Sequence, residues 1–277
     1  MTDRKAVSRQ AFFNTCLVVG NIALALLAFC FAFVLGATQF PEMVVYSGVC
    51  AFTGMFLSYG AIVAIVAVFG HSALPQRVAS LLAGIAIALC LFCVSFSVMG
   101  DLDLAATHFV GGIIAGMLWL ALLQNIFGWR IQPKNAALVL KQTGQFELRL
   151  LFYWTVGFAI LFTLLRRSNV TSASILALLT MALITSTLVL TIIASVIQPR
   201  KKIFWASGAL ILTLVGIFIE TGLLKSVLSP TVPFWFSSFI VISTNTGIVV
   251  AAIVSGVSFR LIGFTIVRTR GDQPHTL

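Results

Sequence analysis

The sequence predicts an all-α, polytopic transmembrane helix bundle of about eight helices, with both termini in the cytoplasm. Three observations predict this class. Apolar residues make up 60% of the chain, charged residues make up only 9%, and the mean hydropathy is +1.11, whereas a soluble domain is about 45–50% apolar. The apolar residues form blocks of about 20, the length at which a helix crosses a bilayer. Lys and Arg are concentrated in alternate loops between these blocks.

The predicted spans, in order, are residues 15–37, 44–69, 78–99, 104–127, 150–165, 172–197, 203–224 and 234–255. The first block follows Arg4, Lys5 and Arg9 and could be a signal peptide, but a run of about twenty residues favours a retained signal anchor. The spans leave no room for a soluble domain, so residues 1–277 are expected to form a single integral membrane domain. The longest loop, residues 128–149, is predicted to be cytoplasmic and divides the chain into halves 1–127 and 150–277. These halves do not align by residue identity, which leaves an internal repeat as a hypothesis.

The orientation follows from the distribution of basic residues. Every Lys and Arg falls on the side that holds both termini, except Arg166, Arg167 and Lys225. Because cytoplasmic loops carry an excess of Lys and Arg, this side is assigned to the cytoplasm. Arg166 and Arg167 follow the shortest span, residues 150–165, which either thins the bilayer or lets its arginines reach the head groups. If that span did not cross, the basic cluster at 200–202 would move outside, so the eight-span arrangement is preferred.

Glu220 is an acidic residue inside a predicted span, about one turn from its outer end. An ionised carboxylate is costly in lipid, so this residue is a candidate functional group, although its side chain could instead reach the head groups. His108 lies at a similar depth in the fourth span and could meet Glu220. With Asp101 and Asp103 these groups could bind a cation or relay a proton, or the two aspartates could cap their helix.

The last span contains five small or polar residues in succession, which are Ser243, Thr244, Asn245, Thr246 and Gly247. Such a run can mark an unwound helix, whose freed backbone groups bind ions or solutes near the middle of the bilayer. Asn245, Ser243 and Thr244 would then supply polar ligands. The alternative is that small and hydroxylated residues let two helices approach and form hydrogen bonds.

Small and hydroxylated residues also recur on two other helix faces, where assembly surfaces are expected. One face of the sixth span carries Thr180, Thr187, Thr191 and Ser195, and the fourth span has the G-x-x-x-G spacing at Gly112 and Gly116. After the last span, apolar residues alternate with Arg260, Thr265 and Arg268. This segment is expected to be either a helical extension at the inner interface or a disordered basic tail.

No enzyme signature is present in the sequence. It lacks H-E-x-x-H, Walker and G-x-S-x-G motifs, its three histidines are scattered, and its five cysteines lie in apolar blocks. We therefore expect no catalytic residue, metal site or cofactor, and no enzymatic activity. The basic residues flank the spans rather than forming a patch, so nucleic acid is not an expected partner. The expected partners are the lipid bilayer and either other membrane subunits or a small solute.

Residues 145–155 carry one resemblance to known proteins. Gln145, Phe146, Leu148 and Arg149, followed by apolar residues and Thr155, resemble a segment of uncharacterised multi-span inner-membrane proteins of planctomycete-type bacteria. Those proteins have Ser or Thr where this chain has Glu147. The resemblance implies a multi-pass protein of the inner (plasma) membrane and implies no activity. From the residues, the expected function is a small-solute or ion permease, or alternatively a non-catalytic structural or assembly subunit of a membrane complex.

Overall fold

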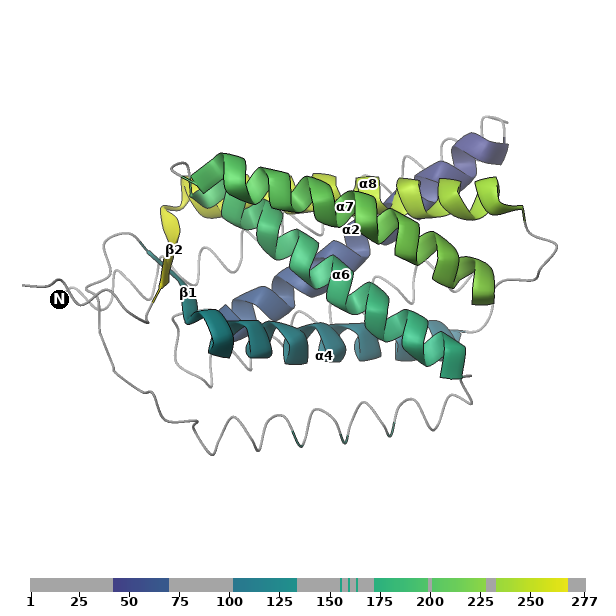
Figure 1. The fold of residues 1–277 in the computed structure, drawn as a ribbon, viewed down its shortest axis with the longest axis horizontal. Helices are drawn as coiled ribbons and strands as arrows, with labels where there is room; N and C mark the ends of the chain where they lie inside the picture. The colour runs from purple at the N-terminus through teal and green to yellow at the C-terminus, as the bar shows by residue number, and fades with distance from the viewer. Residues whose placement is uncertain are drawn as a thin grey trace, which may run out of the picture.

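The computed structural model describes residues 42–69, 102–133, 172–198, 201–227 and 233–268, together with Thr155, Ala159 and Thr163. These residues form helices α2 (Glu42–Phe69), α4 (Leu102–Phe127), α6 (Ser172–Ile197), α7 (Lys202–Val227) and α8 (Phe234–Leu261) (Figure 1). Strands β1 (Trp129–Pro133) and β2 (Phe264–Arg268) form a two-stranded sheet. All five helices are long and apolar enough to cross a membrane. The chain is therefore an integral membrane protein with several transmembrane helices.

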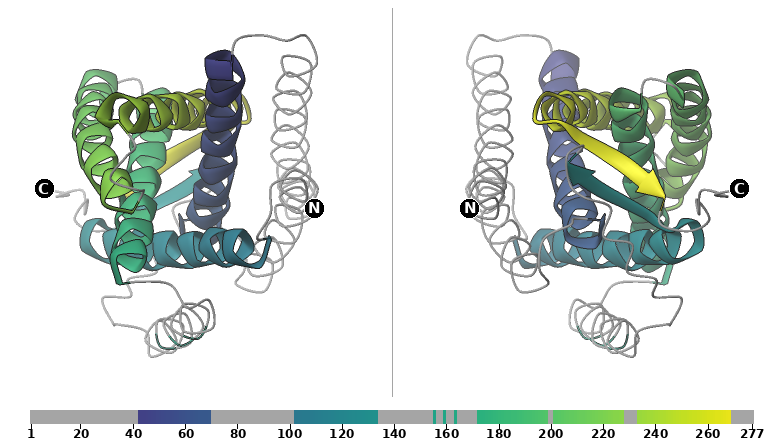
Figure 2. Two further views of the ribbon diagram at one scale, coloured as in Figure 1. Left: turned by 90° about the vertical axis from the view of Figure 1, so that its right-hand side faces the viewer. Right: turned by 90° about the vertical axis from the view of Figure 1, so that its left-hand side faces the viewer.

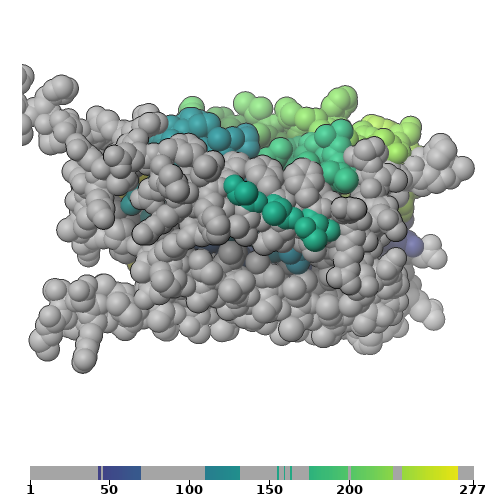
Figure 3. Space-filling view, turned by 90° about the horizontal axis from the view of Figure 1, so that it is seen from below, coloured from purple at the N-terminus to yellow at the C-terminus, as the bar shows by residue number. Residues whose placement is uncertain are grey.

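These five helices correspond to five of the predicted spans. The bounds of α6 match the prediction, whereas α8 continues past the predicted end at residue 255 because Gly256 still packs against Val196 and Phe259 is still buried. The spans predicted at 15–37 and 78–99 lie outside the described residues. In the fifth span only Thr155, Ala159 and Thr163 are described, and all three are helical and exposed. The colour of this segment appears on the surface that Figure 3 shows. A total of eight helices and two cytoplasmic termini therefore stay predictions.

The described helices run in the directions that the predicted order of the spans requires. Helices α2, α4, α6 and α8 all end at the side where the two strands lie, and α7 begins there and runs back (Figure 1). The strands lie across this end of the bundle in the right-hand view of Figure 2. Because β1 follows α4 and β2 follows α8, their pairing places the segments after these two helices at the same end of the bundle. The sequence had assigned both segments to the basic side.

The segment after α8 corrects one expectation, since residues 264–268 are neither a helical extension nor a disordered tail. The helix ends at Leu261, the chain turns through Gly263 with φ of +86°, and β2 then pairs antiparallel with β1, with Ile131 opposite Ile266. Glycine adopts this left-handed conformation without strain. In a strand, alternate residues share a face, so Phe264 and Ile266 pack against the core while Thr265 lies on the other face. The alternation of apolar and polar residues therefore reflects a strand.

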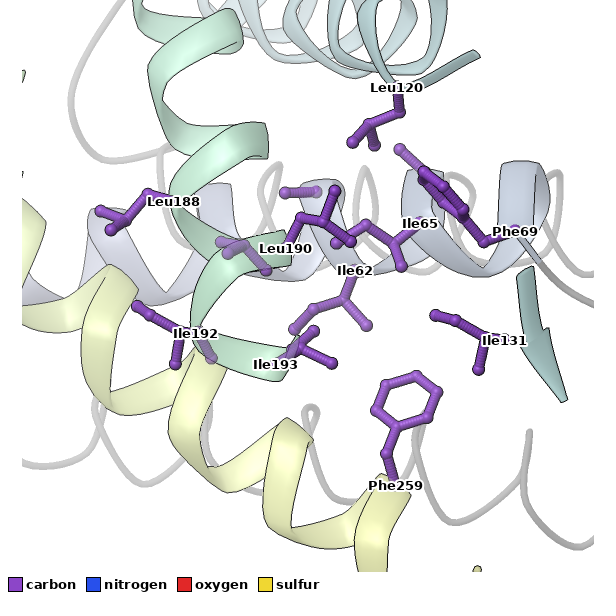
Figure 4. Packing of buried hydrophobic residues seen from close by; sticks show 14 of the residues in the cluster. Ile62, Ile65, Phe69, Leu120, Ile131, Leu188, Leu190, Ile192, Ile193 and Phe259 are labelled. Carbon is purple, nitrogen blue, oxygen red and sulfur yellow. The ribbon is translucent and has the colours of Figure 1, made fainter. Parts of the chain in front are cut away.

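The main apolar core lies between α2, α6 and α8 and extends to the sheet. Figure 4 shows residues of four helices and of β1 pointing toward one another, and Ile65, Leu188 and Ile193 are fully buried. Phe259 at the end of α8 contacts Phe264 of β2 edge to face, with ring centroids 5.9 Å apart. By contrast, α7 exposes large apolar side chains along its length, including Phe218 at 77%. An apolar face of this size is expected to contact lipid.

Small residues let the helices approach closely, as expected from the sequence. Gly116 of the G-x-x-x-G pair packs against Ser186 of α6. The Trp119 indole donates a hydrogen bond of 2.8 Å to the Thr187 hydroxyl, which lies on the predicted hydroxylated face of α6. Thr187 of the predicted face therefore contacts α4, whereas Thr191 of the same face lies beside Gly208 of α7.

Candidate functional site

A buried carboxylate and a buried amide meet between α7 and α8. Nδ2 of Asn245 donates a hydrogen bond of 2.6 Å to Oε2 of Glu220. Both side chains are only 2% exposed, although α7 is the helix whose candidate span is least buried. The pair therefore lies on the one side of α7 that faces the protein, and it connects two helices at membrane depth.

The local helix geometry fixes the orientation of the amide. Nδ2 of Asn245 also donates to the backbone carbonyl of Val241, one turn earlier on α8, at 3.1 Å. Because a carbonyl and a carboxylate both accept from the same nitrogen, the NH2 group faces Glu220 and the amide oxygen does not. The buried amide oxygen Oδ1 has no hydrogen-bond partner among the described residues.

Glu220 lies deeper than the sequence suggested. Helix α7 continues to Val227, so Glu220 is seven residues from its end, which is about two turns or 10 Å along the axis. The next residue, Thr221, is 1% exposed, and its hydroxyl oxygen is buried with no partner in the described part of the chain. Two buried oxygen atoms therefore lack a partner among the described residues: Oδ1 of Asn245 itself and the hydroxyl of Thr221, the neighbour of Glu220 in the sequence.

The predicted break in α8 is wrong, because the helix is continuous from Phe234 to Leu261. The hydroxyls of Thr244 and Thr246 donate to backbone carbonyls one turn earlier, at 2.9 and 2.8 Å. Such bonds satisfy the hydroxyls without interrupting the helix. The run instead permits a close helix crossing, since a Cβ built on Gly247 would lie 1.9 Å from the carbonyl oxygen of Ala51 in α2. The alternative interpretation of this run, that its small residues let two helices pack closely, is therefore confirmed for α8.

No described contact joins the remaining candidate residues to Glu220. Ser243 is partly buried, and the carbonyl oxygen of Thr244 faces Gly54 of α2 rather than α7. His108 lies on α4, but its side chain is outside those described. Its helix packs mainly against α2 and α6, whereas α7 packs mainly against α6 and α8. Asp101 lies outside the described residues, and the side chain of Asp103 is not described either.

Sequence reasoning missed several buried polar groups. The hydroxyl oxygens of Ser58, Tyr59, Ser237 and Ser255 are buried and have no hydrogen-bond partner among the described residues. Serine is common in packed membrane helices, so its presence alone gives no signal. Thr221 could have been found, because it directly follows Glu220, the candidate carboxylate inside a predicted span.

Comparison with known proteins identifies no relative of this chain. No family model matches the chain, and neither the curated proteins nor the solved structures contain a significant match.

Proposed function

We propose that the chain is a multi-pass permease of the inner (plasma) membrane for an ion or small solute, without enzymatic activity. The observation that carries this proposal is the Glu220–Asn245 pair, a carboxylate and an amide buried between two apolar helices. Ionisable residues at membrane depth are costly, and they commonly mark ion or substrate pathways. Glu220 and Asn245 would form the polar site. His108, Ser243 and Thr244 are secondary candidates, because no described contact joins their side chains to this pair.

The test combines solute binding with transport. Solutes that raise the unfolding temperature of the purified protein in mild detergent are first identified, because a ligand that binds only the folded state stabilises it. Flux of these solutes is then measured in proteoliposomes. We expect Glu220→Gln and Asn245→Leu to abolish flux. Thr246→Ala is the matched control, because Thr246 is exposed on the same helix as Asn245 and its hydroxyl donates to the backbone carbonyl of Ile242, one turn earlier. Wild-type flux in both site variants would refute the proposal.

One observation favours a second function, a non-catalytic structural or assembly subunit of a membrane complex. Helices α2 and α8 cross with backbone atoms in contact, and α8 has no unwound segment. A rigid crossing of this kind suits a scaffold whose outer faces bind other membrane proteins. Purification in mild detergent distinguishes the two functions: a partner that copurifies at fixed stoichiometry, with no stabilising solute, would favour the subunit.

A further inference from the structure

No described cationic side chain faces Glu220 from the helices that pack around it. Helix α7 packs against α6 and α8. Helix α6 contains no ionisable residue. The charged residue of α8, Arg260, is in its last turn, about 22 Å along the helix from Asn245. On α7 itself, Lys202 is at the opposite end, and exposed Lys225 lies over the Phe234 ring, 5.7 Å from its centroid. Within the described ranges, no basic side chain is therefore placed to neutralise this carboxylate.

The geometry of the pair decides which species fits. The group that contacts Oε2 of Glu220 at 2.6 Å is an N–H donor, which would repel a cation at that oxygen. The amide cannot turn its oxygen toward Glu220 without losing the bond from Nδ2 to the carbonyl of Val241. A metal ion such as Ca²⁺ or Mg²⁺ needs about six oxygen ligands. A proton needs only one oxygen atom.

We propose that Glu220 binds a proton and that Asn245 is its positioning residue. This inference rests on the proposed permease function, in which the proton would be the coupling ion. A hydronium ion gives its proton to Oε1, which forms an O–H bond and leaves a water molecule, and return of the proton to water restores the carboxylate. In both states Oε2 still accepts the hydrogen bond from Nδ2 of Asn245, first as a carboxylate oxygen and then as a carbonyl oxygen. The pair can therefore load and unload a proton without rearranging the α7–α8 contact.

The test is labelling of the purified full-length protein with dicyclohexylcarbodiimide, which reacts with protonated carboxyl groups in apolar surroundings. Intact-protein and peptide mass spectrometry locate the label. We expect one label at Glu220, with a rate that falls about tenfold for each pH unit above the midpoint and does not change when Na⁺ or Mg²⁺ is added. Glu220→Gln should lose the label completely. Glu147→Gln, in the predicted cytoplasmic loop, is the control and should keep it.

Asn245→Leu tests the positioning role separately. It should keep the label at Glu220 but shift the pH midpoint of labelling, which a purely structural contact would not do. Protection by Na⁺ or Mg²⁺ at constant pH, a rate independent of pH, or no label on monodisperse wild-type protein would overturn the proton assignment. If labelling follows the expectation but Glu220→Gln retains wild-type solute flux, the proton site stands and the permease proposal fails.

Discussion

Replacing either glycine at the α2–α8 crossing with alanine should strongly destabilise the protein. A Cβ on Gly54 would lie 1.8 Å from the carbonyl oxygen of Thr244, and one on Gly247 would lie 1.9 Å from that of Ala51. Carbon and carbonyl oxygen in contact are about 3.3–3.6 Å apart, so the helices would have to separate by about 1.5 Å. The atoms in the way belong to the backbone and cannot rotate aside.

The expected magnitude follows from this geometry. Overpacking usually costs about 1–3 kcal/mol of unfolding free energy, and a backbone clash belongs at the upper end of that range. With about 2–4 °C per kcal/mol, each variant should unfold about 6–12 °C below wild type. The double variant should cost less than the sum of the two, because the first Cβ already opens the space that the second needs.

The assay is thermal unfolding in mild detergent, followed by the loss of the monodisperse peak in size-exclusion chromatography. Gly222→Ala is the matched control, because no heavy atom lies within 4 Å of its added Cβ. Alanine is a better helix former than glycine by about 1 kcal/mol, so this variant should be at least as stable as wild type. If Gly54→Ala and Gly247→Ala unfold at the wild-type temperature, the backbone contact between α2 and α8 does not exist.

Two further predictions concern the polar pair and the sheet. Asn245→Leu removes the donor to Glu220 and should lower the unfolding free energy by about 1–3 kcal/mol, whereas adding Glu220→Leu should recover most of this loss, because no buried carboxylate then lacks its partner. Denaturant unfolding of the wild type, both single variants and the double variant measures the coupling, and strictly additive effects would refute the bond. Cysteines at Arg130 and Val267, opposite each other in the two strands, should form a disulfide on mild oxidation, whereas cysteines at Arg130 and Thr265 should not. Cross-linking is read from gel mobility after the chain is cleaved between the two strands, and equal cross-linking of both pairs would contradict the register.

The sequence predicted the helices well because each depends mainly on its own composition. Both ends of α6 were correct, since a long apolar run is bounded by polar residues at each end. The strand at residues 264–268 was not predicted, because its partner begins at Trp129 and no local pattern reveals so distant a pairing. A run of five residues, in which Ile266 and Val267 are both apolar, is also too short to distinguish a strand from a short tail.

The candidate site was predicted as separate residues but not as a pair. Glu220 and Asn245 were both selected, since each places a polar group in an apolar segment. Glu220 was grouped with His108 on depth alone, and Asn245 with its neighbours Ser243 and Thr244. Which helix lies beside α7 depends on side-chain packing across the whole bundle, which the sequence of one helix does not specify.

The pairing of β1 with β2 also has a consequence for biogenesis. A ribosome makes β1 directly after α4, but its partner appears only after α8 has been made. Until then, β1 presents unpaired backbone amides and carbonyls, together with Ile131, which is buried in the finished protein. A chain that stalls before Phe264 would keep this strand exposed, which would allow membrane proteases to distinguish incomplete chains from complete ones.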